Sequence, residues 1–156
     1  MISKLSIDDG PMRLALNLAR EAMNWGEVPV GAVVVRRGAL VSQAFNLRET
    51  LRDPSAHAER LALTLAGRAL DSWRLDECVL YVTLEPCPMC AGAIVQARVP
   101  LVVYGARDPK AGACDSLYRL TDDPRLNHRA AVHGGILAEE CSALLTEFFQ
   151  ARRRRT

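Results

Sequence analysis

The sequence predicts a layered α/β domain in which helices pack on a β-sheet. The chain has 156 residues, the size of one ordinary domain, and 49% hydrophobic and 24% charged residues, the composition of a globular protein. Helical and strand patterns alternate through the middle of the chain, as is typical of helices that cover a sheet. We therefore expect one domain over 1–156, with a core at about 9–150 and a basic C-terminal tail at 152–155.

The N-terminal third predicts one helix and one β-hairpin. Asp8 and Asp9, followed by Pro11, are typical of a helix start, and small and apolar residues then recur at helical spacing to about Asn24. A valine-rich run, an Arg-Gly turn and a second short run predict paired strands near 30–36 and 39–45.

The rest of the chain alternates between helices and strands. Helix-start residues at Asp53, Pro54 and Ser55, followed by an apolar stripe, predict a helix over 53–70. We expect the next unit, 78–106, to be a right-handed parallel strand–helix–strand crossover. The remaining segments, in order, are a long irregular stretch at about 107–130, a weaker strand at 131–137 and a closing helix at 138–155.

Composition excludes several classes of protein. No apolar run approaches the roughly 20 residues that a membrane-spanning helix needs, and the N-terminus lacks the apolar core of a secretory signal. We therefore expect a cytoplasmic protein with no membrane partner. Five cysteines are an odd number, which suits a metal or redox site better than a disulfide framework.

Charge is informative only at the C-terminus. The net charge of +2 predicts no strong partner, but four consecutive arginines occupy 152–155. Such a run is either a solvated helix end or a group that holds the phosphates of a nucleic acid.

Cys87 and Cys90 lie where a predicted strand meets a predicted helix, beside two prolines. Residues three apart on a helix face the same way, and a helix N-terminus stabilises thiolates, the form that binds zinc. The spacing alone leaves three interpretations open: a redox pair, half of a metal site, or two core cysteines.

His57 favours the metal site. A single histidine in an apolar helix is ordinarily a packed residue, but His57 opens a helix and Glu59 follows it closely. If the two helix starts converge, one nitrogen and two sulfurs meet, and the fourth tetrahedral position stays open to water, as in catalytic zinc sites. Glu59 would then move the proton of that water; its alternative role is that of a solvated surface residue. The other cysteines and histidines are scattered, namely Cys78 and Cys141, which we expect in the core, Cys114, His128 and His133.

The segments "HAE" and "PCPMC" together resemble the H-x-E…P-C-x-x-C signature of the zinc-dependent cytidine/deoxycytidylate deaminase superfamily. Within it the chain is most similar to the bacterial tRNA adenosine deaminases, and the similarity extends over about 9–155. The matching stretches are "EVPVGAVVV", Asn46, "DPSAHAE", "LYVTLEPCPMCAGA", "VYGARDPKAGA", "LNHR" and "GILAEECSALLTEFF". The metal motif indicates deamination but not the substrate.

The resemblance implies a three-layer α/β/α sandwich with a five-stranded mixed sheet, a homodimer and one Zn²⁺ per subunit. It also implies hydrolysis of the wobble adenosine of a tRNA anticodon to inosine, with release of ammonia. By the same resemblance, zinc is held by His57, Cys87 and Cys90, and protons are moved by Glu59. The residues implied to contact the anticodon stem-loop are Asn46, Ala58, Val28, Pro29, Asp108, Lys110, Phe149 and Arg152.

One departure from the family is Asp115, which stands where relatives often carry glycine, so the backbone of that loop is not carried over. For Asp108 and Lys110, the alternative is an ordinary polar turn around Pro109. Three other functions remain open: a free nucleobase deaminase acting on guanine or cytosine, a zinc-stabilised RNA-binding module without catalysis, and a CxxC oxidoreductase.

Overall fold

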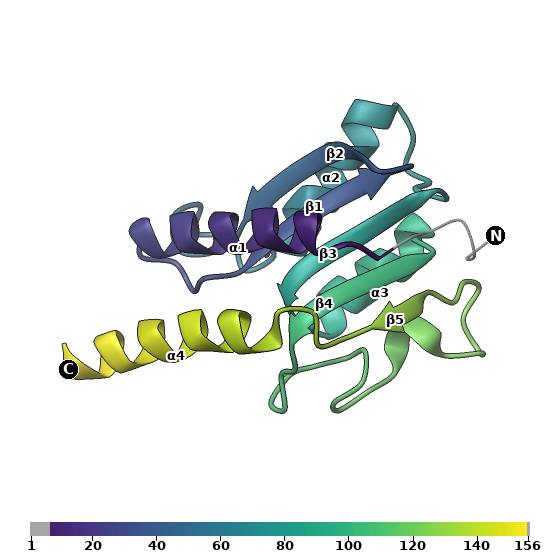
Figure 1. Ribbon diagram of the computed structural model, residues 1–156. Coiled ribbons are helices and arrows are strands. Elements are labelled where there is room, and N and C mark those ends of the chain that lie inside the picture. The colour runs from purple at the N-terminus through teal and green to yellow at the C-terminus, as the bar shows by residue number, and fades with distance from the viewer. Residues whose placement is uncertain (1–6, 156) are drawn as a thin grey trace.

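The computed structural model describes residues 7–155 and contains a five-stranded sheet between two layers of helices (Figure 1). The elements are α1 (Asp9–Asn24), β1 (Gly31–Arg36), β2 (Ala39–Phe45), α2 (Ala58–Leu70), β3 (Cys78–Leu84), α3 (Pro88–Ala97), β4 (Leu101–Ala106), the short 3₁₀ helix η2 (Leu120–Asp122), β5 (Ala131–His133) and α4 (Ala138–Arg154). The strand order is β2-β1-β3-β4-β5. Strand β1 is antiparallel to both neighbours, whereas β3, β4 and β5 are parallel. The predicted fold class is confirmed.

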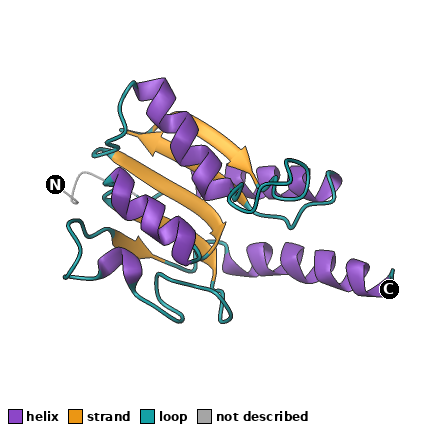
Figure 2. Ribbon diagram, turned by 180° about the vertical axis from the view of Figure 1, so that it is seen from behind, coloured by secondary structure: helices purple, strands orange, loops and turns teal. Residues whose placement is uncertain are grey.

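The sheet has an apolar core on each face. Helices α1 and α4 cover one face, and α2 and α3 cover the other (Figures 1 and 2). Successive side chains of a strand point to opposite faces. In β3, Val79 and Tyr81 therefore pack under α1 and α4, while Leu80 and Val82 pack under α2 and α3. Burial on both sides explains why this strand reads as one continuous apolar run.

The hairpin of β1 and β2 turns as its sequence predicts. Arg37 and Gly38 have φ values of +52° and +79°. Positive φ at both central residues is the requirement of a type I′ turn, whose twist matches that of the flanking strands.

Helix α2 begins at Ala58, not at Asp53, so this part of the prediction was wrong. The Asp53 carboxylate accepts hydrogen bonds from the backbone N–H (2.8 Å) and the hydroxyl (2.7 Å) of Ser55. The Ser55 carbonyl in turn accepts from the His57 N–H at 2.8 Å. These local bonds hold the segment in a turn, and they compete with a helix. His57 is consequently the residue that precedes the helix and not a member of it.

Strand β5 also differs from its prediction, because it ends at His133 and does not continue to 137. Gly134 lies so close to the Tyr104 ring that a side chain there would overlap it, and Gly135 has a φ of +91°. The pair turns the chain away from the sheet toward α4.

Helix α4 extends to Arg154, close to the predicted end at 155, so the basic C-terminal segment is mostly helical. The first half of the helix packs on the sheet through Cys141, while its C-terminal half projects from the body of the molecule (Figure 1). Among the described residues, no helix combines the length and the apolar character needed to cross a bilayer.

Candidate metal centre and active-site cleft

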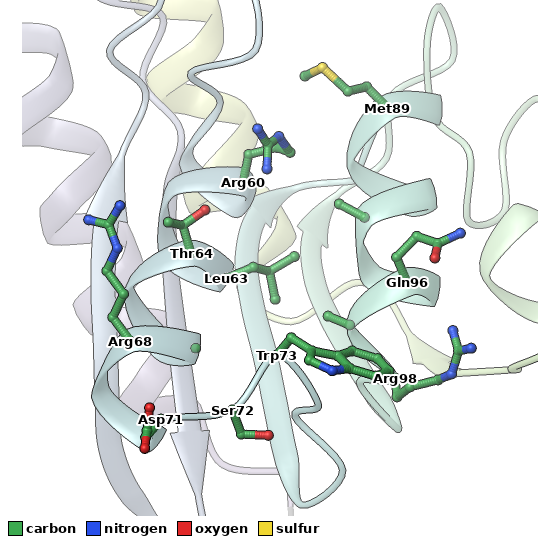
Figure 3. A pocket seen from close by; sticks show the side chains of 13 residues that line it. Arg60, Leu63, Thr64, Arg68, Asp71, Ser72, Trp73, Met89, Gln96 and Arg98 are labelled. Carbon is green, nitrogen blue, oxygen red and sulfur yellow. The ribbon is translucent and has the colours of Figure 1, made fainter.

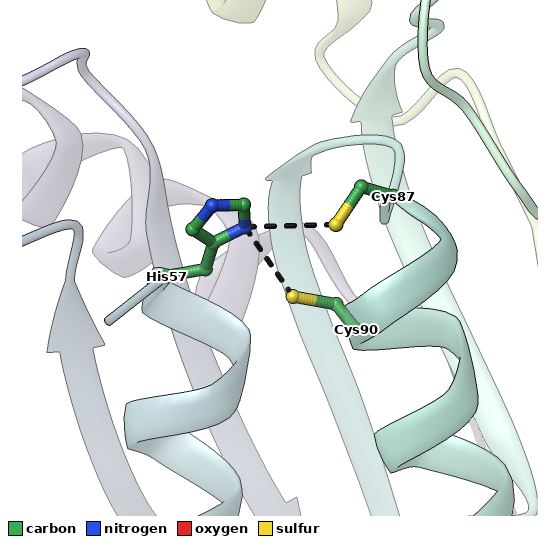
Figure 4. A group of neighbouring side chains, drawn as sticks. All are labelled: His57, Cys87 and Cys90. Carbon is green, nitrogen blue, oxygen red and sulfur yellow. Dashed lines mark hydrogen bonds between the residues drawn. The ribbon is translucent and has the colours of Figure 1, made fainter. Parts of the chain in front are cut away.

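Three potential metal ligands meet at the starts of two helices. His57 is the N-cap of α2 and Cys87 is the N-cap of α3, and Cys90 lies in the first turn of α3. His57 Nδ1 lies 3.6 Å from Cys87 Sγ and 3.5 Å from Cys90 Sγ (Figure 4). The short turn at 53–57, which precedes α2, brings the His57 imidazole to this point. Strand β3, which ends at Leu84, brings the sulfurs to the same point.

The spacing fits a tetrahedral zinc ion. Zinc lies about 2.3 Å from thiolate sulfur and about 2.0–2.1 Å from imidazole nitrogen, so tetrahedral angles separate the two ligand atoms by about 3.6 Å. Both measured N···S distances are within 0.1 Å of that value. The ligand atoms of His57, Cys87 and Cys90 all lie within 4.8 Å of one another, and this is the metal-binding group found among the described residues. A set of three protein ligands is typical of catalytic zinc, whereas structural zinc has four.

The two thiols have opposite acidities. The pKa of Cys87 is lowered to about 4, first because the Cys90 thiol donates a hydrogen bond to it, and also because of His57. The pKa of Cys90 is raised, because its proton is held by Cys87 and because the side chain is buried. The pair therefore holds a thiolate at neutral pH, which is the form that binds a metal.

Glu59 lies beside this group without belonging to it. The residue is in the first turn of α2 and only 4% exposed. Burial raises the pKa of its carboxyl above the usual value. A buried carboxyl whose pKa is raised by its surroundings is suited to accept and return a proton during a reaction.

The metal-binding group opens into a cleft of about 810 Å³, called the active-site cleft below. Among the predicted substrate contacts on this side, Val28, Asn46 and Ala58 line the cleft. The Asn46 amide donates to the Val28 carbonyl at 3.2 Å, and its oxygen accepts from the Arg48 N–H at 3.1 Å. Pro29 is buried and is not among the described residues that line the cleft; Val30 lines it instead.

The opposite wall is the segment 107–111, which contains Asp108 and Lys110. The Asp108 carboxylate accepts from the backbone N–H groups of Lys110 (3.0 Å) and Ala111 (3.2 Å), so this segment is a polar turn that faces the cleft. Asp115 is not among the described non-glycine residues with positive φ, so this position does not need glycine here. Its side chain accepts a hydrogen bond of 2.5 Å from the Tyr104 hydroxyl.

The rim of the cleft is formed by the last turns of α4. Phe149 is 43% exposed, and both it and Arg152 line the cleft. The Arg152 guanidinium lies 5.6 Å from the centre of the Phe148 ring, which holds it over an aromatic surface. Exposed aromatic and basic side chains together suit nucleotides, which offer both bases and phosphates.

Several lining residues were not predicted from the sequence, namely Val30, Arg48, Leu84, Glu85, Arg107, Pro109, Ala111, Leu145 and Thr146, whereas Arg153 belongs to the arginine run predicted to contact RNA. Arg48 and Arg107 add positive charge to the lining of the cleft. Glu85 could have been suspected, because a carboxylate at the end of an apolar strand needs a specific partner. The other residues carry no local signal.

The segment 8–153 matches a protein-family model described as MafB19-like deaminase. The tRNA-specific adenosine deaminase of Bacillus subtilis (strain 168) is 49% identical over 148 residues, which is 95% of this chain and 92% of that protein.

Solved structures of two kinds are similar. A structure from work on A-to-I editing by tRNA:A34 deaminases at the wobble position of transfer RNA is 42% identical, with a TM-score of 0.85, and the match covers 88% of this chain and 100% of that one. The guanine deaminase of Nitrosomonas europaea is 28% identical, with a TM-score of 0.81, and the match covers 92% and 85% of the two chains.

Proposed function

Because this chain belongs to the MafB19-like deaminases, we propose that it is a deaminase acting on tRNA. The reaction we propose is hydrolysis of the wobble adenosine of a tRNA anticodon to inosine, with release of ammonia. The relatives that support this substrate are the tRNA-specific adenosine deaminases. The observation that carries the proposal is the spacing of His57, Cys87 and Cys90, which suits zinc, next to the buried Glu59. Agreement between this geometry and the relatives' activity supports deamination over the other functions.

We infer that one Zn²⁺ per subunit is held by His57 Nδ1 and the two sulfurs. When bound, the metal would supply a Lewis acid that activates water for attack on carbon 6 of adenine. Glu59 would take up the proton released in that step and deliver protons to the ring and to the departing amine. Its raised pKa and its burial, which excludes bulk water, suit both transfers.

The cleft suits an extruded nucleotide. We propose that Asn46 and the Ala58 N–H hold the adenosine, with Val28 and Val30 forming apolar wall. Asp108, Lys110, Phe149 and Arg152 would contact neighbouring nucleotides of the anticodon loop. Unpaired loop nucleotides can be splayed out at little cost, whereas a stacked base cannot reach a buried centre. We infer a cytoplasmic location from the tRNA substrate.

We also propose that two chains form a homodimer. Helices α2 and α3 enclose a groove of about 950 Å³ on their outer side, called the α2–α3 groove (Figure 3). Trp73 (64% exposed) and Met89 (38% exposed) line it at opposite ends (Figure 3). Large exposed apolar side chains along a groove are typical of protein interaction surfaces. Met89 lies between the two cysteine ligands in sequence, so a partner here would contact the helix that carries the metal centre.

The proposal is tested with a panel of tRNA anticodon stem-loops, followed by nucleoside analysis for inosine. We expect inosine at the wobble adenosine with the wild-type protein, and none with the Glu59→Ala variant, whose zinc content and fold should be retained. Unchanged inosine formation by this variant would refute the catalytic role of Glu59. Zinc binding without any inosine would instead indicate an RNA-binding module.

Free nucleobase deamination is the second candidate, because the solved guanine deaminase has a similar fold. The same preparations are therefore assayed with free guanine and cytosine. Turnover of either base that equals or exceeds turnover of the stem-loop would overturn the tRNA assignment. A CxxC oxidoreductase would instead form a reducible disulfide and contain no metal, which elemental analysis detects.

A further inference from the structure

Glu85 is a buried carboxylate with no part in the chemistry above. All of its side-chain hydrogen bonds are accepted from one loop, the segment 108–116. Its side chain accepts from the backbone N–H groups of Asp108 (3.1 Å), Cys114 (3.2 Å), Asp115 (2.8 Å) and Ser116 (2.8 Å). The Ser116 hydroxyl is a fifth donor. Only 2% of Glu85 is exposed.

These bonds join the two halves of the active-site cleft. Glu85 follows the last residue of β3 and precedes the Pro86–Cys87 turn, so its backbone belongs to the metal-binding side. Its partners belong to the segment 108–116, whose first residues form the opposite wall. The Ala113 N–H also donates to the Pro86 carbonyl at 2.8 Å.

The loop is shaped to receive this carboxylate. A side chain at position 112 would overlap the Glu85 carboxyl group, so Gly112 allows the backbone to close around it. Five donors of the loop converge on the two carboxylate oxygens, an arrangement that suits an ionised carboxylate. The side chain is therefore the anchor around which the loop is built.

We propose that Glu85 is a positioning residue that holds the 107–111 wall in place for the nucleotides flanking the target base. The proposal rests on the function proposed above. The wall contacts RNA in that account, whereas the metal centre is held by α2 and α3. Loss of the anchor should therefore weaken substrate binding without removing zinc or stopping the chemical step.

The test variant is Glu85→Gln, which keeps size and shape. The three N–H groups at Oε2 will orient the amide oxygen toward themselves, so that the new NH₂ group faces the Asp108 N–H and the Ser116 hydroxyl. The hydroxyl can rotate to accept from the NH₂ group, whereas the Asp108 N–H loses its acceptor at the start of the wall. The matched control is Glu77→Gln at the other end of β3, where the exposed carboxylate pairs with Arg36 and Arg37.

We expect Glu85→Gln to raise the KM for the stem-loop about 10-fold, with kcat within about 3-fold of the wild type, since an unpaired buried donor weakens the bound state. Zinc content should be unchanged, and Glu77→Gln should match the wild type. An unchanged KM, a fall in kcat alone, or loss of zinc would overturn the proposal.

A second measurement separates this proposal from the proposed function. Amide hydrogen exchange on the wild type and Glu85→Gln, without RNA, should show faster exchange at 108 and its neighbours in the variant, and unchanged exchange at 49 and 50. This result supports the anchor even if no inosine forms, and equal exchange rates refute it. If Glu85→Gln does not fold, Ser116→Ala decides the question: removal of its hydroxyl should raise KM about 3-fold, and an unchanged KM would refute the anchor.

Discussion

The metal centre uses two positions that ordinarily serve the stability of helices. His57 and Cys87 are the N-caps of α2 and α3, and neither side chain makes a capping hydrogen bond. Residues such as Ser, Asn and Asp are preferred there, and they stabilise a helix by about 1 kcal/mol relative to residues that cannot cap. The chain therefore gives up local stability twice to present a nitrogen and a sulfur at one point.

This trade predicts an unusual result for Cys87→Ser. Zinc affinity should fall by more than 100-fold, because a neutral hydroxyl replaces a thiolate. In the presence of a chelator, the same variant should be as stable as the wild type or more stable by up to about 1 kcal/mol, because serine caps α3. Metal titration and urea unfolding measure the two effects.

Cys78→Ser is the control for that experiment. Cys78 is buried at the start of β3, away from the metal-binding group. Its substitution should lower the free energy of unfolding by about 1–3 kcal/mol and leave zinc affinity unchanged. If both variants lose stability equally with chelator present, the capping argument is wrong.

At the scale of elements, helix α4 begins on the sheet and places basic side chains from its last turns at the active-site cleft. Its N-terminal half packs on the sheet through Cys141, and Arg152 and Arg153 line the cleft a little more than one turn beyond Phe148. Arg154 and Arg155 follow at the end of the helix and are not among the described residues that line the cleft. Position on the helix, and not charge alone, should therefore decide which arginines contact RNA.

Two double variants test this. Arg152→Ala with Arg153→Ala should weaken stem-loop binding about 10-fold or more and reduce the salt dependence, log Kd against log salt, by about 1.4 for two lost phosphate contacts on a single strand. Arg154→Ala with Arg155→Ala removes the same charge and should change both quantities much less. Equal effects would show that only the overall charge of the helix end matters.

The elements that the sequence predicted well are those with local signals. The hairpin turn at Arg37-Gly38 and helix α3 after Pro88 are specified by residues at the turn and at the helix start. The start of α2 was mispredicted because Asp53 and Ser55 are as well suited to a turn as to a helix start.

Elements fixed by distant partners could not be predicted. The segment 108–116 takes its shape from Glu85, more than twenty residues earlier, and nothing in its own sequence identifies that carboxylate. The loop after β2 is similar, because the buried Glu27 accepts from the N–H groups of Glu49 (3.0 Å) and Thr50 (2.7 Å). The metal ligands could be recognised because metal binding requires particular residue types at a particular spacing in the sequence. The walls of the cleft carry no such pattern and could not be recognised.

For the whole molecule, Glu27 and Glu85 predict loss of stability in acid. Burial opposes ionisation of both, but hydrogen bonds to their carboxylates lower each pKa below the ordinary value of 4.5. A lowered folded-state pKa contributes stability that is present above pH 4.5 and is lost as the pH falls through the folded-state pKa. Glu59, whose pKa is raised, has the opposite sign and partly offsets this loss.

Urea unfolding from pH 7 to pH 3.5, with chelator present so that metal release does not contribute, measures this dependence. The free energy of unfolding should fall below about pH 4.5, and Glu27→Gln or Glu85→Gln should lower it at pH 7 and flatten its decline. Glu147→Gln, on the exposed side of α4, should leave the curve unchanged. A decline of equal slope in all variants would assign acid sensitivity to other groups.

Assembly is the remaining property of the whole molecule, and it depends on the α2–α3 groove. The guanidinium groups of Arg74 and Arg98 lie 5.5 and 5.9 Å from the centre of the Trp73 ring. Trp73 and Arg98 lie together at one end of the groove (Figure 3). An exposed indole flanked by arginines suits an interface contact, because Trp and Arg are enriched among the residues that contribute most to binding.

If two chains pair here, Trp73→Ser should convert the dimer to a monomer in light scattering at micromolar concentration. Trp25→Ser, an equally drastic change at an exposed indole on the opposite layer, should remain dimeric. A Trp73→Ser protein that stays dimeric would place the interface on another face, and a monomeric wild type would refute the dimer itself.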